Sequence, residues 1–226
     1  MSNLNLRAIR ATLSGGIAFF VLIFLPAWTI DYWQGWVFLG TFMVPLTLIT
    51  VWMAVYDKEL LERRLRGGPR AERTAAQKRF TAVAPFVGIV AVVIMVFDYR
   101  FGWSPSVPAW LSLVGDGFVG LGIVIYYLVV RENRFAAATV EIAEGQTVVS
   151  TGPYATVRHP MYAGAILFLV GAPIALGSWW GLLFTLLFIG GFVWRLLNEE
   201  QFLCTNLPGY TEYKRKVPYR LVPHIW

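Results

Sequence analysis

The sequence predicts an all-α, polytopic integral membrane protein with about six apolar helices and a cytoplasmic carboxy-terminal segment. Of its 226 residues, 57% are hydrophobic and only 14% are charged, whereas about 25% of residues are charged in an average soluble domain. The apolar residues also form long runs that approach the roughly 20 residues a membrane-spanning helix needs. Composition and run length together therefore predict several membrane crossings.

The apolar runs differ in length. The four longer runs cover residues 13–30, 35–56, 81–97 and 109–130, and two shorter runs cover 161–177 and 180–195. The first two runs are joined by a short turn and form a hairpin. The last two are joined around Gly177-Ser178 and form a short hairpin, for which length leaves two interpretations open: two full crossings or a re-entrant hairpin.

The placement of basic residues predicts the orientation. Eighteen of the 19 Lys and Arg residues fall at the amino terminus, in 57–80, in 131–160 or from Arg195 onward, and Arg100 falls on the other side. By the positive-inside rule, six crossings then place both termini in the cytoplasm, which for a prokaryote means the inner membrane. Topology and contact with anionic membrane lipid explain the net charge of +6, so no nucleic-acid partner is expected.

Residues 1–129 are predicted to be a transmembrane scaffold of four helices. Their basic loop, residues 57–80, reads as a helical extension, a break at Gly67-Gly68-Pro69 and a second helix. Its mixed charges suit a solvated amphipathic surface, and a lid or partner site is the alternative role. Packing between neighbouring chains, and hence a homo-oligomer, is the alternative role for the first two spans.

The fourth span carries two features that resemble functional signals. Residues 115–120 match the pattern G-x-G-x-x-G, but no strand precedes them, as a dinucleotide-binding unit requires. We interpret these glycines as a helix-packing surface. Asp116 is an ionisable group within a membrane helix, and its place near the outer end predicts water access or a polar neighbour.

Residues 130–226 form the second predicted unit. The alternating stretch 140–149 predicts a small turn or hairpin. It leads into the motif 152–164, which is dense in polar and aromatic side chains just before an apolar run. Within it, Pro160 is suited to begin a helix.

The motif contains groups that suit an anionic ligand. His159 would lie beside the free N–H groups of a helix amino terminus, and Arg158 adds a planar guanidinium. Together they suit a carboxylate or a phosphate. Tyr154 and Tyr162 supply hydroxyl groups, or ring faces for a purine or a cation.

A second polar group follows the hairpin. Arg195 and Glu199 share one helix face at i,i+4 spacing, and the adjacent carboxylates Glu199 and Glu200 suit an ammonium group or ribose hydroxyls. The alternative for each residue is turn chemistry or a solvated helix end. No cluster with metal-ligand spacing is apparent, so no metal is expected.

These motifs carry a family resemblance. The chain has Gly152-Pro153-Tyr154, then 157–164, Asn198-Glu199-Glu200, Tyr210-x-x-Tyr213 and 217–223 in this order. In this pattern it closely resembles the isoprenylcysteine carboxyl methyltransferase family, to which the membrane phospholipid methyltransferases are related. The resemblance covers roughly residues 130–226, and residues 1–129 resemble the family only in hydropathy.

The resemblance implies an S-adenosylmethionine site formed by the hairpin and the carboxy-terminal segment. It implies that the cofactor contacts come from Tyr154, His159, Tyr162, Glu199 and Glu200, with the backbone near Val157 and Arg158 assisting. It also implies a lipophilic acceptor that enters from the lipid side. A carboxylate acceptor needs a cation to orient it, for which Arg195 is the candidate, and an amine acceptor needs a base, for which Glu199 is the candidate.

The expected function is therefore methyl transfer from S-adenosylmethionine to a lipophilic acceptor, with the carboxylate of a prenylcysteine-like or isoprenoid compound preferred. A phospholipid N-methyltransferase is one alternative. Another is a nicotinamide-dependent membrane reductase of sterols or isoprenoids, which has a similar carboxy-terminal signature, and a third is a non-enzymatic scaffold or transporter. The paired Glu199-Glu200 and the short chain favour the methyltransferase.

Overall fold

The computed structural model describes residues 3–67, 72, 75–136 and 145–226. Most of these residues are helical, and none of them forms a strand. The helices are α1 (Asn3–Ala27), α2 (Trp33–Tyr56), α3 (Lys58–Leu65), α4 (Ala75–Phe101), α5 (Ala109–Glu132), η2 (Gly152–Ala155), α6 (Pro160–Ala175), α7 (Gly181–Asn206) and α8 (Tyr210–Lys216). Five of them are long and apolar enough to cross a membrane, and α6 is a shorter apolar helix. The predicted polytopic all-α class is confirmed.

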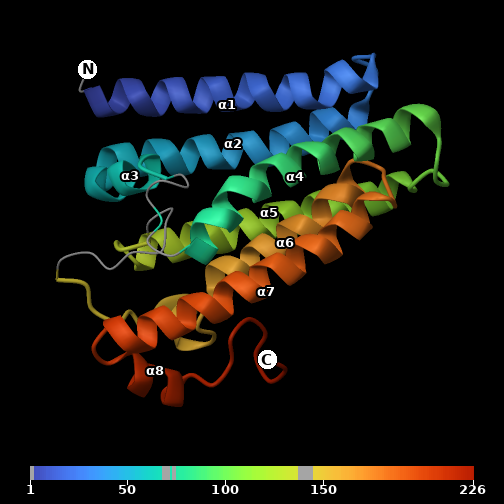
Figure 1. Cartoon of the computed structure of the whole chain (residues 1–226). Helices are drawn as coiled ribbons and strands as arrows, with labels where there is room; N and C mark the ends of the chain where they lie inside the picture. Colours follow the sequence, from blue (N-terminus) through green and yellow to red (C-terminus); the bar gives the residue numbers. More distant parts are fainter. Residues whose placement is uncertain (1–2, 68–71, 73–74, 137–144) are drawn as a thin grey trace.

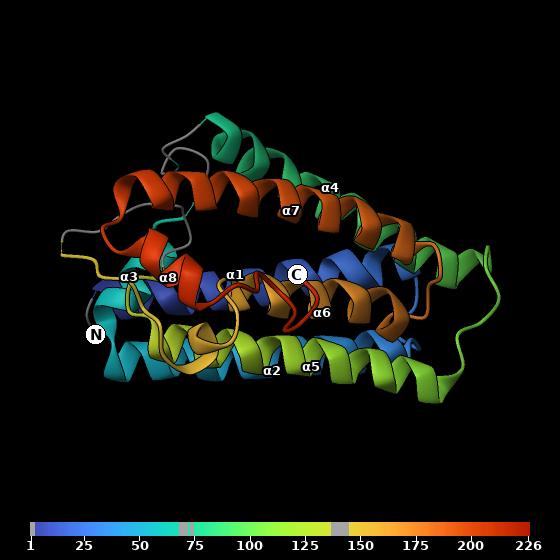
Figure 2. The same ribbon diagram turned by 90° about the horizontal axis from the view of Figure 1, so that it is seen from below.

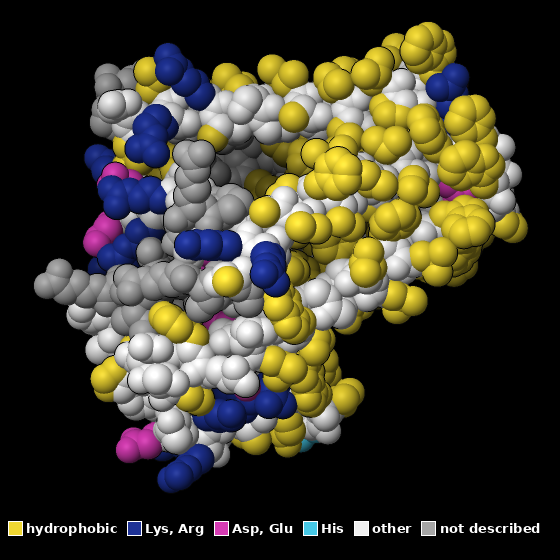
Figure 3. All heavy atoms as spheres, in the orientation of Figure 1, with side chains coloured by type: hydrophobic (Ala, Val, Ile, Leu, Met, Phe, Trp, Pro, Cys, Tyr) yellow, Lys and Arg dark blue, Asp and Glu magenta, His cyan; other side chains and the backbone are white. Residues whose placement is uncertain are grey.

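The six apolar helices, which are the five long ones and the shorter α6, pack as a closed ring. Contacts follow the order α1, α2, α5, α6, α7 and α4, and α4 returns to α1; Figures 1 and 2 show this bundle from two directions. Fully buried side chains such as Ile23, Phe38 and Leu176 fill its interior. Many large apolar side chains point outward instead, and Figure 3 shows them covering much of the bundle surface, as expected where lipid replaces water.

Glycines allow α5 and α6 to cross with their backbones in contact. A Cβ atom on Gly122 would stand 2.5 Å from the carbonyl oxygen of Gly164. Two helical turns further along the same crossing, a Cβ on Gly171 would stand 2.5 Å from the carbonyl oxygen of Gly115. Both distances are too short for any side chain, so these positions require glycine. Small residues at helix crossings are the usual means of close packing in membranes.

The packing interpretation of the G-x-G-x-x-G pattern is therefore right for its first glycine only. A Cβ on Gly117 would meet nothing within 4 Å, and one on Gly120 would make an ordinary 3.7 Å contact with Thr41. The glycines that matter, Gly115 and Gly122, are seven residues apart. That spacing keeps them on one helix face, which the two-residue spacing from Gly115 to Gly117 does not.

The hairpin of α6 and α7 reaches the far end of the bundle. At its turn, the Ser178 hydroxyl donates a 2.6 Å hydrogen bond to Asp98, at the end of α4, and the Tyr32 hydroxyl donates to the carbonyl of Leu176. Tyr32 and Asp98 mark the predicted outer turns. The hairpin thus extends along the bundle to the predicted outer turns, which favours two crossings over a re-entrant hairpin.

The second arm of the hairpin is longer than predicted. Helix α7 has 26 residues, whereas the apolar run suggested 180–195. The polar residues that follow Arg195 contain no proline or glycine, so the helix continues until it nears Pro208-Gly209, where Gly209 adopts a φ of 84°. Glu199 and Glu200 thus lie on α7 itself, and Arg195 and Glu199 share one helix, as their spacing predicted. Pro160 occupies the first turn of α6, as predicted.

Two further expectations need correction or restriction. Asp116 is 5% exposed, and neither of its carboxylate oxygens has a hydrogen-bond partner among the described residues. The expected water access or polar neighbour is therefore wrong, because this face of α5 turns into the ring. In the stretch 140–149, residues 140–144 lie outside the described residues, and the remainder contains a turn at Gly145 and no strand.

Candidate active site

A cavity opens among the helix ends that carry most of the basic residues. Its volume is about 480 Å³, within the range of small-molecule sites. Side chains from α4, α6, α7 and α8 line it, together with the end of α5 and the segment 146–149. Figure 3 shows the basic side chains gathered at this end of the bundle and apolar ones over the rest.

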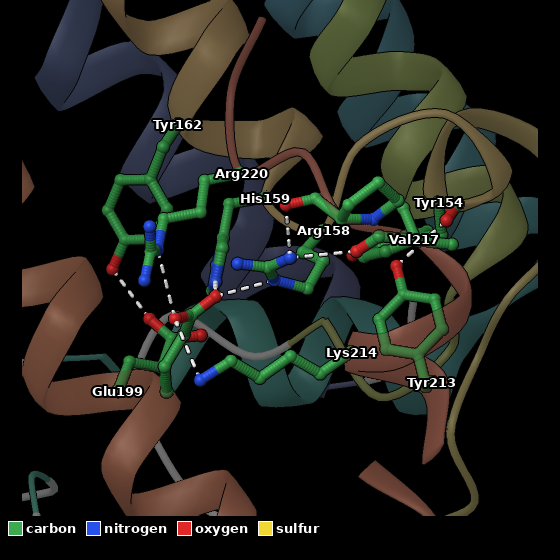
Figure 4. A network of polar contacts seen from close by, with 11 residues as sticks. Tyr154, Arg158, His159, Tyr162, Glu199, Tyr213, Lys214, Val217 and Arg220 are labelled. Carbon is green, nitrogen blue, oxygen red and sulfur yellow. Dashed lines mark hydrogen bonds and ion pairs between the residues drawn. The ribbon is translucent and has the colours of Figure 1, made fainter. Parts of the chain in front are cut away.

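A buried carboxylate lies beside this cavity and organises its polar wall. Glu200 is 3% exposed, and it accepts hydrogen bonds from Arg158 Nε at 2.6 Å and from Arg220 Nε at 3.0 Å. His159 Nε2 lies 3.3 Å from the same carboxylate, and Lys214 Nζ lies 3.8 Å from it. Figure 4 shows Arg158 and His159 from the segment before α6, Lys214 of α8 and Arg220 of the tail pointing toward one another. A buried carboxylate requires such partners.

Arg158 also ties the carboxy-terminal segment to the motif. Its Nη1 donates 2.7 Å hydrogen bonds to the carbonyls of Val217 and Pro218. The backbone N–H groups of Arg158 and His159 donate to the carbonyls of residues 219–220, each at 2.9 Å. The cation that the sequence suggested for a ligand anion is thus occupied by the chain itself. Sequence reasoning missed this because the partner groups lie 42 or more residues away.

The predicted site residues divide into two groups. Those that line the cavity are Tyr154, Arg158, His159, Tyr162, Arg195 and Glu199. Val157 and Glu200 lie behind its wall: Val157 is 6% exposed, and its N–H donates to the carbonyl of Pro153. The structure therefore brings all the predicted residues into one region and separates those that face the cavity from those that support it.

A chain of hydrogen bonds connects the predicted catalytic pair. The Tyr162 hydroxyl donates to Glu199 Oε2 at 2.7 Å, and Arg195 Nε donates to the Tyr162 oxygen at 3.0 Å. Beyond it, Arg195 Nη2 donates to Glu72 Oε1 at 2.8 Å. Arg195 and Glu199 are therefore linked through Tyr162 rather than by the direct pair that their i,i+4 spacing suggested.

Glu72 corrects the interpretation of the 57–80 loop. Its two acidic neighbours on α3, Glu59 and Glu62, form exposed ion pairs with Arg63 and Arg66, as a solvated surface should. Glu72 is instead 2% exposed. It is buried because the guanidinium of α7 needs a counter-charge in this position. An acidic residue within a strongly basic loop was the only signal in the sequence.

Tyr154 is held by residues that sequence reasoning did not select. Asn133 Nδ2, at the end of α5, donates to the Tyr154 hydroxyl at 3.0 Å, and the Tyr213 hydroxyl donates to the Tyr154 carbonyl at 2.8 Å. Burial raises the pKa of Tyr154 from 10.0 to about 12, so its hydroxyl stays neutral at physiological pH. The polar run that ends the fourth span was the available signal for Asn133.

Tyr210 presents an unpaired hydroxyl at the cavity. Its ring packs with that of Tyr213, and the residue is 4% exposed. Within the described part of the chain, its hydroxyl has no hydrogen-bond partner. Burial raises its pKa above the ordinary value, so this group is a neutral donor. A buried hydroxyl without a partner in a cavity wall is a position that a ligand can satisfy.

Apolar side chains line another part of the cavity. They belong to Phe80, Ala84 and Pro85 of α4, Ala165 of α6 and Phe192 of α7. Phe80 packs against the Arg195 guanidinium and Phe192 against the Tyr162 ring, so the apolar part adjoins the polar one. Such a cavity suits two ligand parts of opposite polarity.

Comparison with known proteins relates the chain to membrane methyltransferases. Residues 110–207 match the phospholipid methyltransferase family. The Protein-S-isoprenylcysteine O-methyltransferase of Schizosaccharomyces pombe is 37% identical over 73 residues, which cover 31% of each chain. The Cobalt-zinc-cadmium resistance protein CzcN of Cupriavidus metallidurans is 25% identical over 134 residues, 57% of this chain and 59% of that protein.

The match thus spans less than two thirds of either relative. Together these similarities indicate a membrane methyltransferase of the phospholipid or isoprenylcysteine type, and they confirm the resemblance found in the sequence. Among the described residues, no group of three or more His, Cys, Asp or Glu side chains is arranged to hold a metal ion.

Proposed function

We propose that this protein transfers a methyl group from S-adenosylmethionine to a lipophilic acceptor, with the carboxylate of a prenylcysteine-like or isoprenoid compound as the preferred acceptor. The observation that carries the proposal is that one cavity is lined both by polar groups of α6 to α8 and by apolar side chains of α4, α6 and α7. The membrane methyltransferase relatives support the same reaction class.

The residues at the polar end fit the cofactor. S-adenosylmethionine has an ammonium group, a carboxylate, ribose hydroxyls and a purine. Glu199 offers an anionic oxygen beside Tyr162, Tyr210 offers a hydroxyl that has no partner in the described chain, and Tyr154 and His159 also face the cavity. When bound, the cofactor supplies a methyl group on a sulfonium, which is transferred by in-line displacement.

The supporting residues keep this wall rigid. Glu200 holds Arg158 and His159 from behind, and the N–H of Val157 is fixed within its own turn. Rigid placement matters because methyl transfer needs positioning more than covalent help from the protein. In this proposal Glu200 and Val157 act on the cofactor site indirectly, through the residues that line it.

Arg195 is suited to orient a carboxylate acceptor. A guanidinium has five N–H donors, and groups of the described chain accept from Nε, Nη1 and Nη2 once each. The remaining donors leave room for an acceptor carboxylate. The adjoining apolar wall suits its hydrocarbon chain, which would enter from the lipid side.

A phospholipid amine is the second candidate acceptor. The family match over residues 110–207 favours it, and Glu199 would then remove the proton from the attacking amine. The two acceptors require different groups. A carboxylate depends on Arg195, whereas an amine depends on Glu199 as a base.

The orientation in the membrane belongs to the same proposal. The start of α1, helix α8 and the cavity lie at the end of the bundle where basic side chains gather, and the tail after α8 turns back along the bundle (Figures 1 and 3). We place this end in the cytoplasm, where soluble cofactor is available, and for a bacterium the membrane would be the inner one. A homo-oligomer formed through α1 and α2 stays a prediction.

The test uses the full-length protein in lipid nanodiscs. We expect calorimetry to show binding of S-adenosylmethionine and its demethylated product, and weaker binding by Glu199→Ala and His159→Ala. Asn198→Ala is the matched control, because its amide bonds only to its own helix. Saturable binding of NADPH, with no binding of S-adenosylmethionine or its demethylated product, would overturn the proposal and favour the reductase.

A second assay identifies the acceptor. Methyl transfer from labelled S-adenosylmethionine is measured with a prenylcysteine, a small isoprenoid acid and phosphatidylethanolamine. We expect transfer to the first two. Transfer to phosphatidylethanolamine alone would establish the amine acceptor instead.

A further inference from the structure

We infer that Glu72, which lies outside the matched residues 110–207, is a positioning residue that fixes Arg195 for the acceptor. This inference rests on the proposed function. It assigns part of the active site to the amino-terminal half of the chain, which the sequence suggested to be only a scaffold.

The geometry around Glu72 is that of a buried, shared ion pair. Its Oε1 accepts from Arg195 Nη2 at 2.8 Å and from the Thr81 hydroxyl at 2.9 Å. Thr81 Oγ1 in turn accepts from Arg195 Nη1 at 2.9 Å. The side chain of Glu72 is 0% exposed and that of Arg195 is 11% exposed. Glu72, Thr81 and Arg195 therefore form a closed triangle of hydrogen bonds.

The triangle fixes the plane of the guanidinium. Three of its nitrogens are held from different directions, by Glu72, Thr81 and Tyr162, and its carbon lies 5.1 Å from the centre of the Phe80 ring. A planar donor fork binds a carboxylate well only when the plane is correctly aimed. Holding it in advance reduces the entropy lost on binding.

Glu72 also sets the charge at this wall of the cavity. A buried guanidinium without a counter-charge is strongly destabilised. The ion pair of Arg195 with Glu72 has no net charge. Arg195 therefore orients the acceptor carboxylate rather than attracting it by net charge. A misplaced orienting group costs catalytic rate even when both ligands still bind, since reaction requires near-attack geometry.

The test compares Glu72→Gln with Glu62→Gln, which removes an acid of the same loop that lies in an exposed ion pair. For Glu72→Gln we expect kcat/KM for the acceptor to fall about 10- to 100-fold. We expect its affinity for the demethylated cofactor to stay within about twofold of wild type, as for distant surface changes. Glu62→Gln should leave both quantities unchanged.

A double-mutant cycle separates positioning from a general structural role. If Glu72 acts through Arg195, Glu72→Gln should cost little more in an Arg195→Gln background, because the interaction is already lost. Additive losses would overturn the inference. Should Glu72→Gln fail to fold, Thr81→Val removes two of the three hydrogen bonds of the triangle without changing the charge, and it should lower the same acceptor kcat/KM.

The outcomes also distinguish this inference from the function on which it rests. A wild-type protein that binds no methyl donor and transfers no methyl group to any acceptor overturns the proposed function. A wild-type protein that is active, with Glu72→Gln and Thr81→Val equally active, overturns only the role of Glu72.

Discussion

Arg158 and Glu200 lie 42 residues apart in the chain and meet at 2.6 Å with both side chains buried. Arg158 precedes the hairpin and Glu200 follows most of it, so their contact joins the start of α6 to the last turns of α7. Arg220 reaches the same carboxylate from the tail. One buried anion thus joins three segments of the chain around the cavity.

We expect Glu200→Gln to destabilise the protein by about 3–5 kcal/mol, because it leaves buried cations without their counter-charge. The measurement is the thermal unfolding midpoint in detergent, followed by intrinsic fluorescence. Glu212→Gln, an acid exposed on α8, is the control and should leave the midpoint unchanged. Equal midpoints for both variants would show that the network contributes no net stability.

The α5–α6 crossing should not tolerate a methyl group. Gly122→Ala would place a Cβ atom 2.5 Å from a backbone carbonyl, and we expect a loss of about 1–3 kcal/mol or more from overpacking. Gly117→Ala is the matched control on the same helix, since nothing lies within 4 Å, and it should be neutral or stabilising. The yield of folded protein and its unfolding midpoint report both effects. Equal behaviour of the two variants would contradict the backbone contact.

Tyr210→Phe should weaken cofactor binding without weakening the fold. The hydroxyl has no partner in the described chain, so its removal breaks no hydrogen bond of the free protein. A hydrogen bond to the ligand contributes about 0.5–1.5 kcal/mol, and we expect a matching loss of affinity in calorimetry. Tyr213→Phe provides the contrast, because that hydroxyl bonds to the Tyr154 carbonyl and its loss should lower the unfolding midpoint. A Tyr210→Phe protein with unchanged affinity would show that the hydroxyl does not meet the cofactor.

Stability should decrease in alkali as pH rises from about 10 to 12. Burial raises the pKa of Tyr154 from 10.0 to about 12, so the unfolded chain releases this proton first and gains from doing so. The contribution is constant below pH 10, where both states are protonated. Tyr154→Phe should make the decline shallower, as measured by the unfolding midpoint against pH, whereas Tyr56→Phe, at a site 73% exposed, should not. A slope unaffected by Tyr154→Phe would assign the decline to other groups.

The sequence was sufficient to predict the bundle because its signals are local. Apolar run length predicts each crossing, and Pro160 marks the start of α6. The hairpin turn was left open because its depth depends on distant contacts. The periodicity of apolar residues along the chain does not reveal these contacts, which join Ser178 to Asp98 and Tyr32 to Leu176.

The candidate site was only partly predictable, for the same reason. Recurrent motifs pointed to Glu199, Tyr162 and Arg195, which all face one cavity. The partners of the charged side chains were not predictable. Arg158 was expected to bind a ligand, but it binds Glu200 of the chain itself. Glu72 was expected to be solvated, but it is buried. From sequence alone, an ion pair can be recognised only when its two residues lie about one helical turn apart. A charged residue whose partner is distant in the chain is therefore taken to be unpaired.

The network around Glu200 also determines when the site can be completed during synthesis. The six apolar helices all precede Leu207 in the chain, whereas Arg220 and the carbonyls that bind Arg158 follow it. A chain released prematurely after Asn206 would therefore still insert every apolar helix, yet leave Glu200 without Arg220 and Arg158 without its carbonyls. Such a truncated product would reach the membrane but could not build the polar wall of the cavity, so membrane insertion is no measure of an intact site.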